Sequence, residues 1–168
     1  RLKMREKIKK FLKEILKYTL LLVIVLNVVS YYNSLDLNKE KLDIKTFTLI
    51  DGSKFILQND KPILINFWAT WCPVCKLEES SIEKISKDFQ VVTIATQSGS
   101  SAEVKEYLNK NNLSFIVVND EDGTLAQRFN IKAYPTTFIY DKNQNLKFSE
   151  VGYSSYFGLY LRLLWSQF

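Results

Sequence analysis

The sequence predicts an α/β protein with a mixed central sheet and helices on both faces, opened by a β-hairpin and preceded by one transmembrane helix. Three observations lead to this class. An apolar run of 18 residues follows a basic N-terminus, an Asp-Gly turn divides two alternating segments, and beyond residue 62 strand-like runs alternate with segments of helical periodicity. At 168 residues and 46% apolar content, the chain is long enough to bury one core of ordinary size.

The positive charge of the chain lies at its N-terminus. Residues 1–17 carry eight Lys and Arg against Glu6 and Glu14, whereas the remainder carries 15 basic and 16 acidic residues. The predicted domain is therefore close to neutral, and no basic stripe with interleaved aromatic residues follows the N-terminal segment. This distribution argues against nucleic acid as a partner.

Residues 15–32 are apolar on every side, which is typical of a membrane segment rather than of a helix with one buried face. Tyrosines stand at both ends of this run, and the flanking basic residues lie only on its N-terminal side. We therefore expect residues 1–14 to form a basic head in the cytoplasm and residues 15–32 to anchor the chain in the lipid bilayer. A signal peptide cleaved near Ser30 is the alternative, and it places the rest of the chain on the same side of the membrane.

The polar residues 33–43 are expected to form a short tether, and the folded domain to occupy residues 44–168. Two alternating segments, 44–50 and 53–57, flank the dipeptide Asp51-Gly52. Because Asp-Gly between alternating segments is a strong hairpin signal, the domain is predicted to open with a β-hairpin.

Apolar runs and helical spacing alternate beyond this hairpin. Residues 62–68 are typical of a buried strand, and residues 73–89 carry apolar side chains at helical spacing. The alternation that follows predicts right-handed β-α-β units with parallel strands, then a second hairpin and a closing helix. The remaining predicted elements are strands at 91–95, 115–118, 136–140 and 146–151 and helices at 101–111, 124–129 and 156–165.

The only two cysteines lie three positions apart, in Trp71-Cys72-Pro73-Val74-Cys75, where the predicted strand turns into the predicted helix. Unpaired N–H groups and the helix dipole favour a thiolate at the first turn, lowering a thiol pKa from about 8.5 to somewhere between roughly 3.5 and 7.5. We therefore expect Cys72 to be the accessible nucleophile. Cys75, one turn later and more buried, is expected to resolve the mixed disulfide.

Other uses of a cysteine pair fit the sequence less well. A structural zinc site needs four ligands, and the chain has two cysteines and no histidine, so no metal site is expected. Covalent haem attachment needs a histidine after the second cysteine, where Lys76 stands. An inert pair of core cysteines remains open at this point.

The segment from Asn66 to Glu78 (Asn-Phe-Trp-Ala-Thr-Trp-Cys-Pro-Val-Cys-Lys-Leu-Glu), together with Tyr-Pro-Thr-Thr-Phe at 134–138, resembles the thioredoxin superfamily. It is most similar to the membrane-anchored branch that includes cytochrome c maturation thioredoxins and suppressor-of-copper-sensitivity proteins. The resemblance covers residues 44–168 and implies a thioredoxin-like fold. It also implies that Pro135 follows a cis peptide bond and lies against the active-site disulfide.

The resemblance implies further site residues. Glu78 matches a carboxylate beside the two sulfurs, where it influences proton transfer to the buried cysteine; a solvated position on the helix surface is the alternative. Asn66 stands where thioredoxin itself has a buried aspartate. Tyr134 and Pro135 are expected to shape the substrate groove, although Tyr134 is also compatible with an ordinary aromatic wall.

The function implied is thiol-disulfide exchange with cysteine pairs of envelope proteins, using the Cys72–Cys75 disulfide and no other cofactor. The same resemblance favours reduction, with electrons from a membrane thiol transporter, and a single-pass protein of the bacterial cytoplasmic membrane whose domain lies in the periplasm or outside the cell. Trp71, Pro73 and Val74 are expected to support the site. Pro73 and Val74, the two residues between the cysteines, leave the direction of electron flow open, since small changes in potential reverse it. An oxidising role and a redox-inert binding module are the alternatives.

Overall fold

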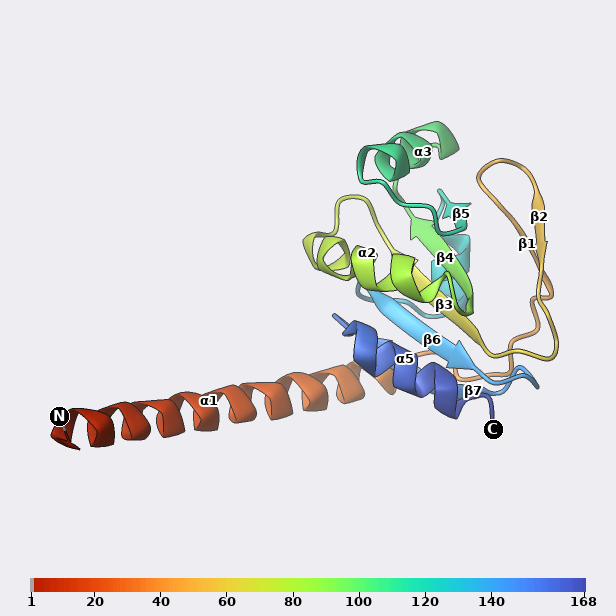
Figure 1. Cartoon of the computed structure of the whole chain (residues 1–168). Helices are drawn as coiled ribbons and strands as arrows, with labels where there is room; N and C mark the ends of the chain where they lie inside the picture. Colours follow the sequence, from red (N-terminus) through yellow and green to blue (C-terminus); the bar gives the residue numbers. More distant parts are fainter. Residues whose placement is uncertain (1) are drawn as a thin grey trace.

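A five-stranded mixed sheet forms the centre of the structure (Figure 1). The structure is a computed structural model that describes the backbone of residues 2–168 and, apart from residues 2, 3, 5, 6 and 26, their side chains. The strand order is β5-β4-β3-β6-β7, with β3 parallel to β4, β4 parallel to β5, and β6 antiparallel to both β3 and β7. The strands are β3 (Ile63–Trp68), β4 (Gln90–Thr96), β5 (Val117–Asp120), β6 (Thr136–Tyr140) and β7 (Leu146–Val151). The predicted mixed sheet is confirmed.

Helices cover both faces of this sheet. On one face, α2 (Pro73–Ile85), α3 (Ser101–Lys110) and α5 (Tyr156–Trp165) enclose a core that contains both cysteines. On the other face, α4 (Thr124–Arg128) and the N-terminal hairpin enclose a second core rich in phenylalanine. Both faces of β3 are therefore buried, which explains why its sequence is an apolar run broken only by Asn66.

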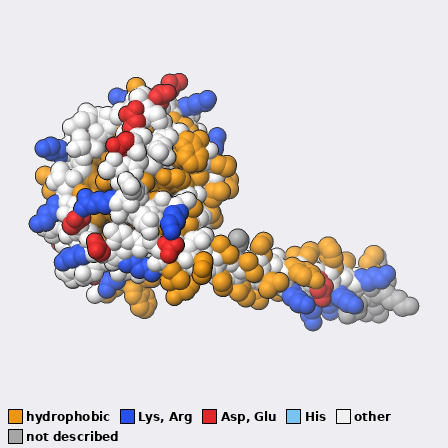
Figure 2. All heavy atoms as spheres, turned by 180° about the vertical axis from the view of Figure 1, so that it is seen from behind, with side chains coloured by type: hydrophobic (Ala, Val, Ile, Leu, Met, Phe, Trp, Pro, Cys, Tyr) orange, Lys and Arg blue, Asp and Glu red, His pale blue; other side chains and the backbone are white. Residues whose placement is uncertain are grey.

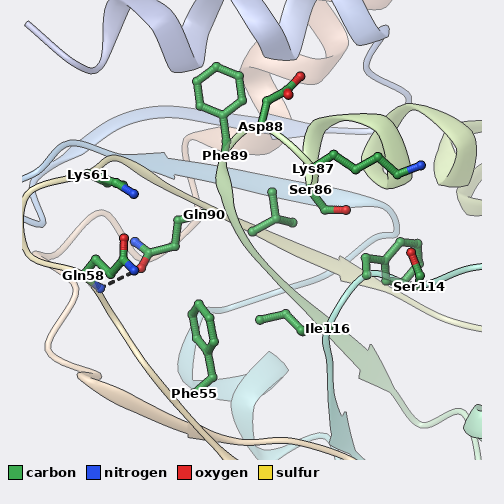
Figure 3. A pocket seen from close by; sticks show the side chains of 12 residues that line it. Phe55, Gln58, Lys61, Ser86, Lys87, Asp88, Phe89, Gln90, Ser114 and Ile116 are labelled. Atoms are coloured by element: carbon green, nitrogen blue, oxygen red, sulfur yellow. Dashed lines mark hydrogen bonds between the residues drawn. The ribbon is translucent and has the colours of Figure 1, made fainter.

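The predicted N-terminal hairpin forms from β1 (Thr46–Thr48) and β2 (Lys54–Ile56), but as a separate two-stranded sheet. It leaves a cavity of about 340 Å³ beside the start of β4 (Figure 3). There the side-chain oxygen of Gln90 accepts a hydrogen bond from the backbone N–H of Gln58, at 2.6 Å. Since Gln90 pairs with the first residue of β3, this cavity lies at the end of the sheet opposite the cysteines.

The N-terminal helix α1 (Leu2–Ser34) is continuous and extends away from the domain (Figure 1). Its residues Lys7–Ser34 are long and apolar enough to cross a membrane, judged by length and composition. This part contains the predicted anchor, residues 15–32, while the predicted basic head is helical from Leu2 onward. Of the basic side chains in that head, Arg1, Lys3 and Arg5 lie outside the described residues.

The segment 33–43, expected to be a tether, packs on the domain. Its first two residues belong to α1, and Leu37 and Leu42 are buried in the second core together with Phe47. These two leucines are apolar side chains within an otherwise polar stretch, and packing in the second core removes them from water. An ion pair of 2.8 Å between Asp36 and Lys132 lies beside them.

The Ser30 hydroxyl fixes the end of α1 to the edge strand of the sheet. It donates a hydrogen bond to the carbonyl of Val151, at 2.8 Å, and accepts one from the N–H of the same residue, at 3.3 Å. Such paired bonds resemble those that a neighbouring strand would make, so α1 occupies the end of the β7 edge. The anchor candidate and the domain are therefore in direct contact.

Candidate redox site

The two cysteines lie where β3 passes into α2, as the sequence predicts. Cys72 is the N-cap residue of α2, with extended backbone, and Pro73 takes the first helical position, where its missing N–H costs no hydrogen bond. The sulfur of Cys72 accepts a hydrogen bond from the N–H of Cys75, at 3.1 Å, and the two residues form a disulfide. The first turn of α2 thus directs a backbone donor at the Cys72 sulfur, which favours its negative charge.

Both cysteines are buried, contrary to the expectation of an accessible Cys72. In this disulfide form Cys72 is 5% exposed and Cys75 is 2% exposed, because both pack into the core between α2 and the sheet. Exposed apolar side chains surround them: Trp71 is 59% exposed, and Val74 also reaches the surface. The order of burial agrees with the assigned roles, since Cys75 lies deeper.

The loop before Cys72 is held by contacts with the loop after β4. The Trp71 indole donates a hydrogen bond to the carbonyl of Gln97, at 3.0 Å, and the N–H of Thr70 donates to the hydroxyl of Ser98, also at 3.0 Å. The Trp71 ring meets Tyr134 edge to face, with 5.7 Å between ring centroids. Tyr134 therefore lies next to the residue that precedes Cys72.

The peptide bond between Tyr134 and Pro135 is cis, as the resemblance implies. Pro135 is buried, and its carbonyl accepts a hydrogen bond of 2.8 Å from the N–H of Gly152. This bond brings the segment after β7 next to the cis-proline loop. The half-buried Tyr134 packs against both cores. Burial raises the pKa of its hydroxyl group.

Glu78 lies inside the protein, not on a solvated helix surface. It is 1% exposed and stands one helical turn after Cys75 on α2. One carboxylate oxygen accepts a hydrogen bond from the N–H of Ser154, at 2.8 Å, and the other accepts from the side-chain amide of Asn66, at 3.3 Å. Burial, with a smaller contribution from the nearby acid Glu150, raises the pKa of Glu78 to about 7. The two hydrogen-bond donors act in the opposite direction and lower it.

Asn66 links this acid to the cis-proline strand. Its side-chain amide also donates to the Thr137 hydroxyl, at 2.9 Å, so that β3, β6 and α2 meet at one buried polar cluster. The role of Thr137 and that of Ser154 were missed by the sequence analysis. Ser154 lies 76 residues from Glu78 in the chain, and no periodicity or motif indicates that its backbone N–H is the donor.

The fold and this cysteine pair together define the class of protein. The domain has a thioredoxin-like α/β fold, a disulfide at the start of α2, and a cis-proline loop whose Tyr134 packs against Trp71, the residue before Cys72. These features define a protein-disulfide oxidoreductase of the thioredoxin type. Residues 32–149 match the model of the AhpC/TSA family, and the chain belongs to that family.

Relatives and solved structures agree with this assignment. A thioredoxin-like protein of Haemophilus influenzae is 33% identical over 166 residues, covering 96% of this chain and 98% of that protein. The thiol:disulfide interchange protein DsbE of Yersinia pestis is 31% identical over 98 residues, 58% of this chain and 52% of that protein. A secreted disulfide oxidoreductase of Mycobacterium tuberculosis, described as homologous to DsbE of E. coli, superposes with a TM-score of 0.60 at 28% identity, covering 71% of this chain and 93% of that one.

Proposed function

We propose that this oxidoreductase is anchored in the bacterial cytoplasmic membrane by α1 and reduces disulfides of envelope proteins. The observation that carries the proposal is the buried Cys72–Cys75 pair at the N-terminus of α2, with the buried acid Glu78 one helical turn later. The length and apolar composition of α1 support the anchor. The name of the Yersinia pestis relative, a thiol:disulfide interchange protein, supports protein disulfides as the substrates.

In the reductive direction the dithiol form reacts in two steps. The Cys72 thiolate attacks a target disulfide, so that a bond forms between the two sulfurs and one target thiolate leaves. The Cys75 thiolate then attacks the Cys72 sulfur, which releases the second target thiolate and leaves the Cys72–Cys75 disulfide. Two electrons pass to the target, and a membrane thiol donor returns the pair to the dithiol form.

Glu78 is assigned the control of the proton on Cys75. The second step needs the Cys75 thiol to lose its proton inside the core, where a charged sulfur is costly. Glu78 is one turn away, shielded from water, and its pKa of about 7 allows it to exchange a proton near neutral pH. Asn66 and Ser154 hold the carboxylate in place from two sides.

Trapping of mixed disulfides tests the roles of the two cysteines. Cys75→Ser leaves the attacking sulfur but removes the resolving one, so we expect this variant to accumulate stable adducts with envelope proteins. Cys72→Ser is the matched control, with the same change at the other sulfur, and is expected to trap few. Adducts are counted on non-reducing gels of membrane fractions. Wild-type protein is assayed in parallel for insulin reduction above the dithiothreitol background.

Three outcomes contradict the proposal. Equal trapping by both variants removes the distinction between attacking and resolving cysteine. Absence of trapping together with no insulin reduction identifies a redox-inert module. Trapping without insulin reduction instead favours an oxidising role for the same site.

A further inference from the structure

Polar residues form one stripe on the last turns of α1. Asn27, Ser30 and Asn33 follow one another at intervals of three, and Ser34 lies four residues after Ser30, so the four residues lie on one face of a helix that is apolar before them. A polar side chain in the hydrocarbon core is costly and is usually retained for a contact. Here Ser30 bonds to Val151 and Ser34 is buried, so the stripe faces the domain.

A cavity of about 440 Å³ lies between this stripe and the redox site. Val74, which stands between the two cysteines, and Tyr134, which precedes the cis proline, contribute one side of it, and Asn27 and Asn33 of α1 contribute the other. The segment after β7, including Gly152, closes its third side. The helix that carries the anchor candidate therefore contributes part of the lining, together with the residue between the two cysteines.

The cavity has the groups that an extended polypeptide needs. Asn33 is exposed and offers amide donors and an acceptor, and Asn27 retains its side-chain oxygen after its nitrogen bonds to Val23 within the helix. Gly152 has open space where a side chain would stand, so a second backbone can approach it closely. Apolar contact comes from Val74 and Tyr134.

The position of α1 determines where this cavity lies relative to a membrane that α1 crosses. Figure 1 shows α1 leaving the domain on the side where α2 begins, and Figure 2 shows apolar side chains on the face of the domain that adjoins α1. The exposed apolar residues Val74 and Tyr153 line the cavity together with α1. If α1 crosses the bilayer, the redox site faces the membrane surface.

We propose that residues 27–33 of α1 form one wall of the substrate groove, which receives an extended, cysteine-bearing segment of a partner protein presented at the membrane surface. This inference rests on the proposed exchange function and adds to it the place and shape of the partner. The helix thus acts as a positioning element for the partner chain in addition to its role as an anchor.

Photo-crosslinking within a trapped complex tests this proposal. The full chain carrying Cys75→Ser is reconstituted in vesicles of phosphatidylethanolamine and phosphatidylglycerol, with benzoylphenylalanine in place of Asn33. Val28, on the opposite side of α1 and exposed, is the matched control position. The probe is a short peptide whose single cysteine is bonded to thionitrobenzoate; the Cys72 thiolate displaces that group, forms the disulfide with the peptide and releases a coloured thiolate.

We expect illumination to crosslink the bound peptide roughly tenfold more from position 33 than from position 28, since the two positions lie on different faces of the helix. Equal or absent crosslinking from both positions, in samples where thionitrobenzoate has been released and the mixed disulfide has formed, overturns the proposed wall and leaves the exchange function standing. Release no faster than by free cysteine contradicts the exchange function itself. The two failures are therefore distinguishable.

Discussion

Glu78 is the buried acid to which we assign control of the proton on Cys75. It lies in the core with a backbone N–H on one oxygen and the Asn66 amide near the other. These donors stabilise the charged form, whereas burial favours the neutral form, and the net result is a pKa raised to about 7. Glu78 therefore changes its charge in the range where thiols of lowered pKa also ionise.

The pKa of Glu78 makes the stability of the domain dependent on pH. The folded state binds this proton more tightly than the unfolded state, whose pKa is near 4.5, so stability is greatest below that pH and falls as pH rises towards about 7. The difference corresponds to roughly 3 kcal/mol at ~1.4 kcal/mol per pH unit. We expect this loss to appear in urea unfolding as the difference between the wild type and Glu78→Gln over the same pH range, because the other titrating groups are common to both proteins.

The substitution keeps the volume of the side chain and an oxygen for the Ser154 N–H, so the domain is expected to fold. Glu106→Gln, the same change at an exposed position on α3, serves as the control and should follow the wild-type profile. Thiol titrations of the reduced proteins provide a second measurement. Coincident unfolding profiles and coincident titrations for wild type and Glu78→Gln would show that the buried acid does not titrate in this range.

Much of this site could be predicted from the sequence because its parts are local. The spacing of Cys72 and Cys75, and their place between an apolar strand and a helix, fix the helix-cap geometry within a few residues. The burial of Cys72 in the disulfide form was not predictable in the same way, since it depends on how Trp71 and the facing loops pack. The hydrogen bond from the Ser154 N–H to Glu78 also depends on tertiary structure and could not be predicted from local sequence.

The elements of the fold follow the sequence closely where one side of a segment is apolar. The strands at 136–140 and 146–151 and the helix at 156–165 have the predicted bounds. The fifth strand of the chain, β5, lies two residues later than predicted, because it ends in Asn119 and Asp120, polar residues that gave no strand signal. Asp120 is needed there, as its carboxylate accepts hydrogen bonds from two N–H groups at the start of α4.

Two other elements differ for reasons of capping and packing. Helix α2 ends at Ile85 rather than continuing to Phe89, because the next residues close its last turn with bonds to Ile82, Lys84 and Ile85. Helix α1 continues past its apolar run to Ser34, where it meets the domain. Its contact with β7 joins residues 121 positions apart and has no counterpart in local sequence pattern.

The Ser30 hydroxyl provides a test of the contact between α1 and β7. Ser30→Ala removes both hydrogen bonds to Val151, so we expect hydrogen exchange of the Val151 amide to become roughly fivefold faster, as for loss of about 1 kcal/mol of local protection. Ser34→Ala is the control, since that hydroxyl bonds to Tyr31 within the same helix. Unchanged exchange at Val151 in the first variant would mean that α1 does not dock on β7 in solution.

The whole molecule has two parts of opposite character. The N-terminal helix begins with a cluster of basic residues and continues as an exposed apolar cylinder, whereas the domain that follows carries almost balanced charge (Figure 2). Basic flanks remain on the cytoplasmic side of a membrane, so this asymmetry is the basis of the proposed direction of the chain across the bilayer. Both the anchor and the signal-peptide interpretations place the domain outside the cytoplasm.

A reporter fusion tests this topology. Alkaline phosphatase, which needs disulfides formed outside the cytoplasm, is fused after Phe168, and a fusion lacking residues 1–34 is the control. We expect activity from the full-length fusion and little from the control. A stable but inactive full-length fusion would place the domain in the cytoplasm and remove the topology on which the envelope function depends.

The bond between Glu78 and Ser154 also bears on how the protein matures. A polypeptide is made from its N-terminus, so both cysteines leave the ribosome 76 or more residues before the amide that holds Glu78. Until the segment that contains Ser154 has been synthesised and has folded onto α2, this hydrogen bond is absent. On the proposed role of Glu78, a nascent chain carries the cysteine pair before this acid is held in place, and proton control by Glu78 begins only when the segment around Ser154 has folded.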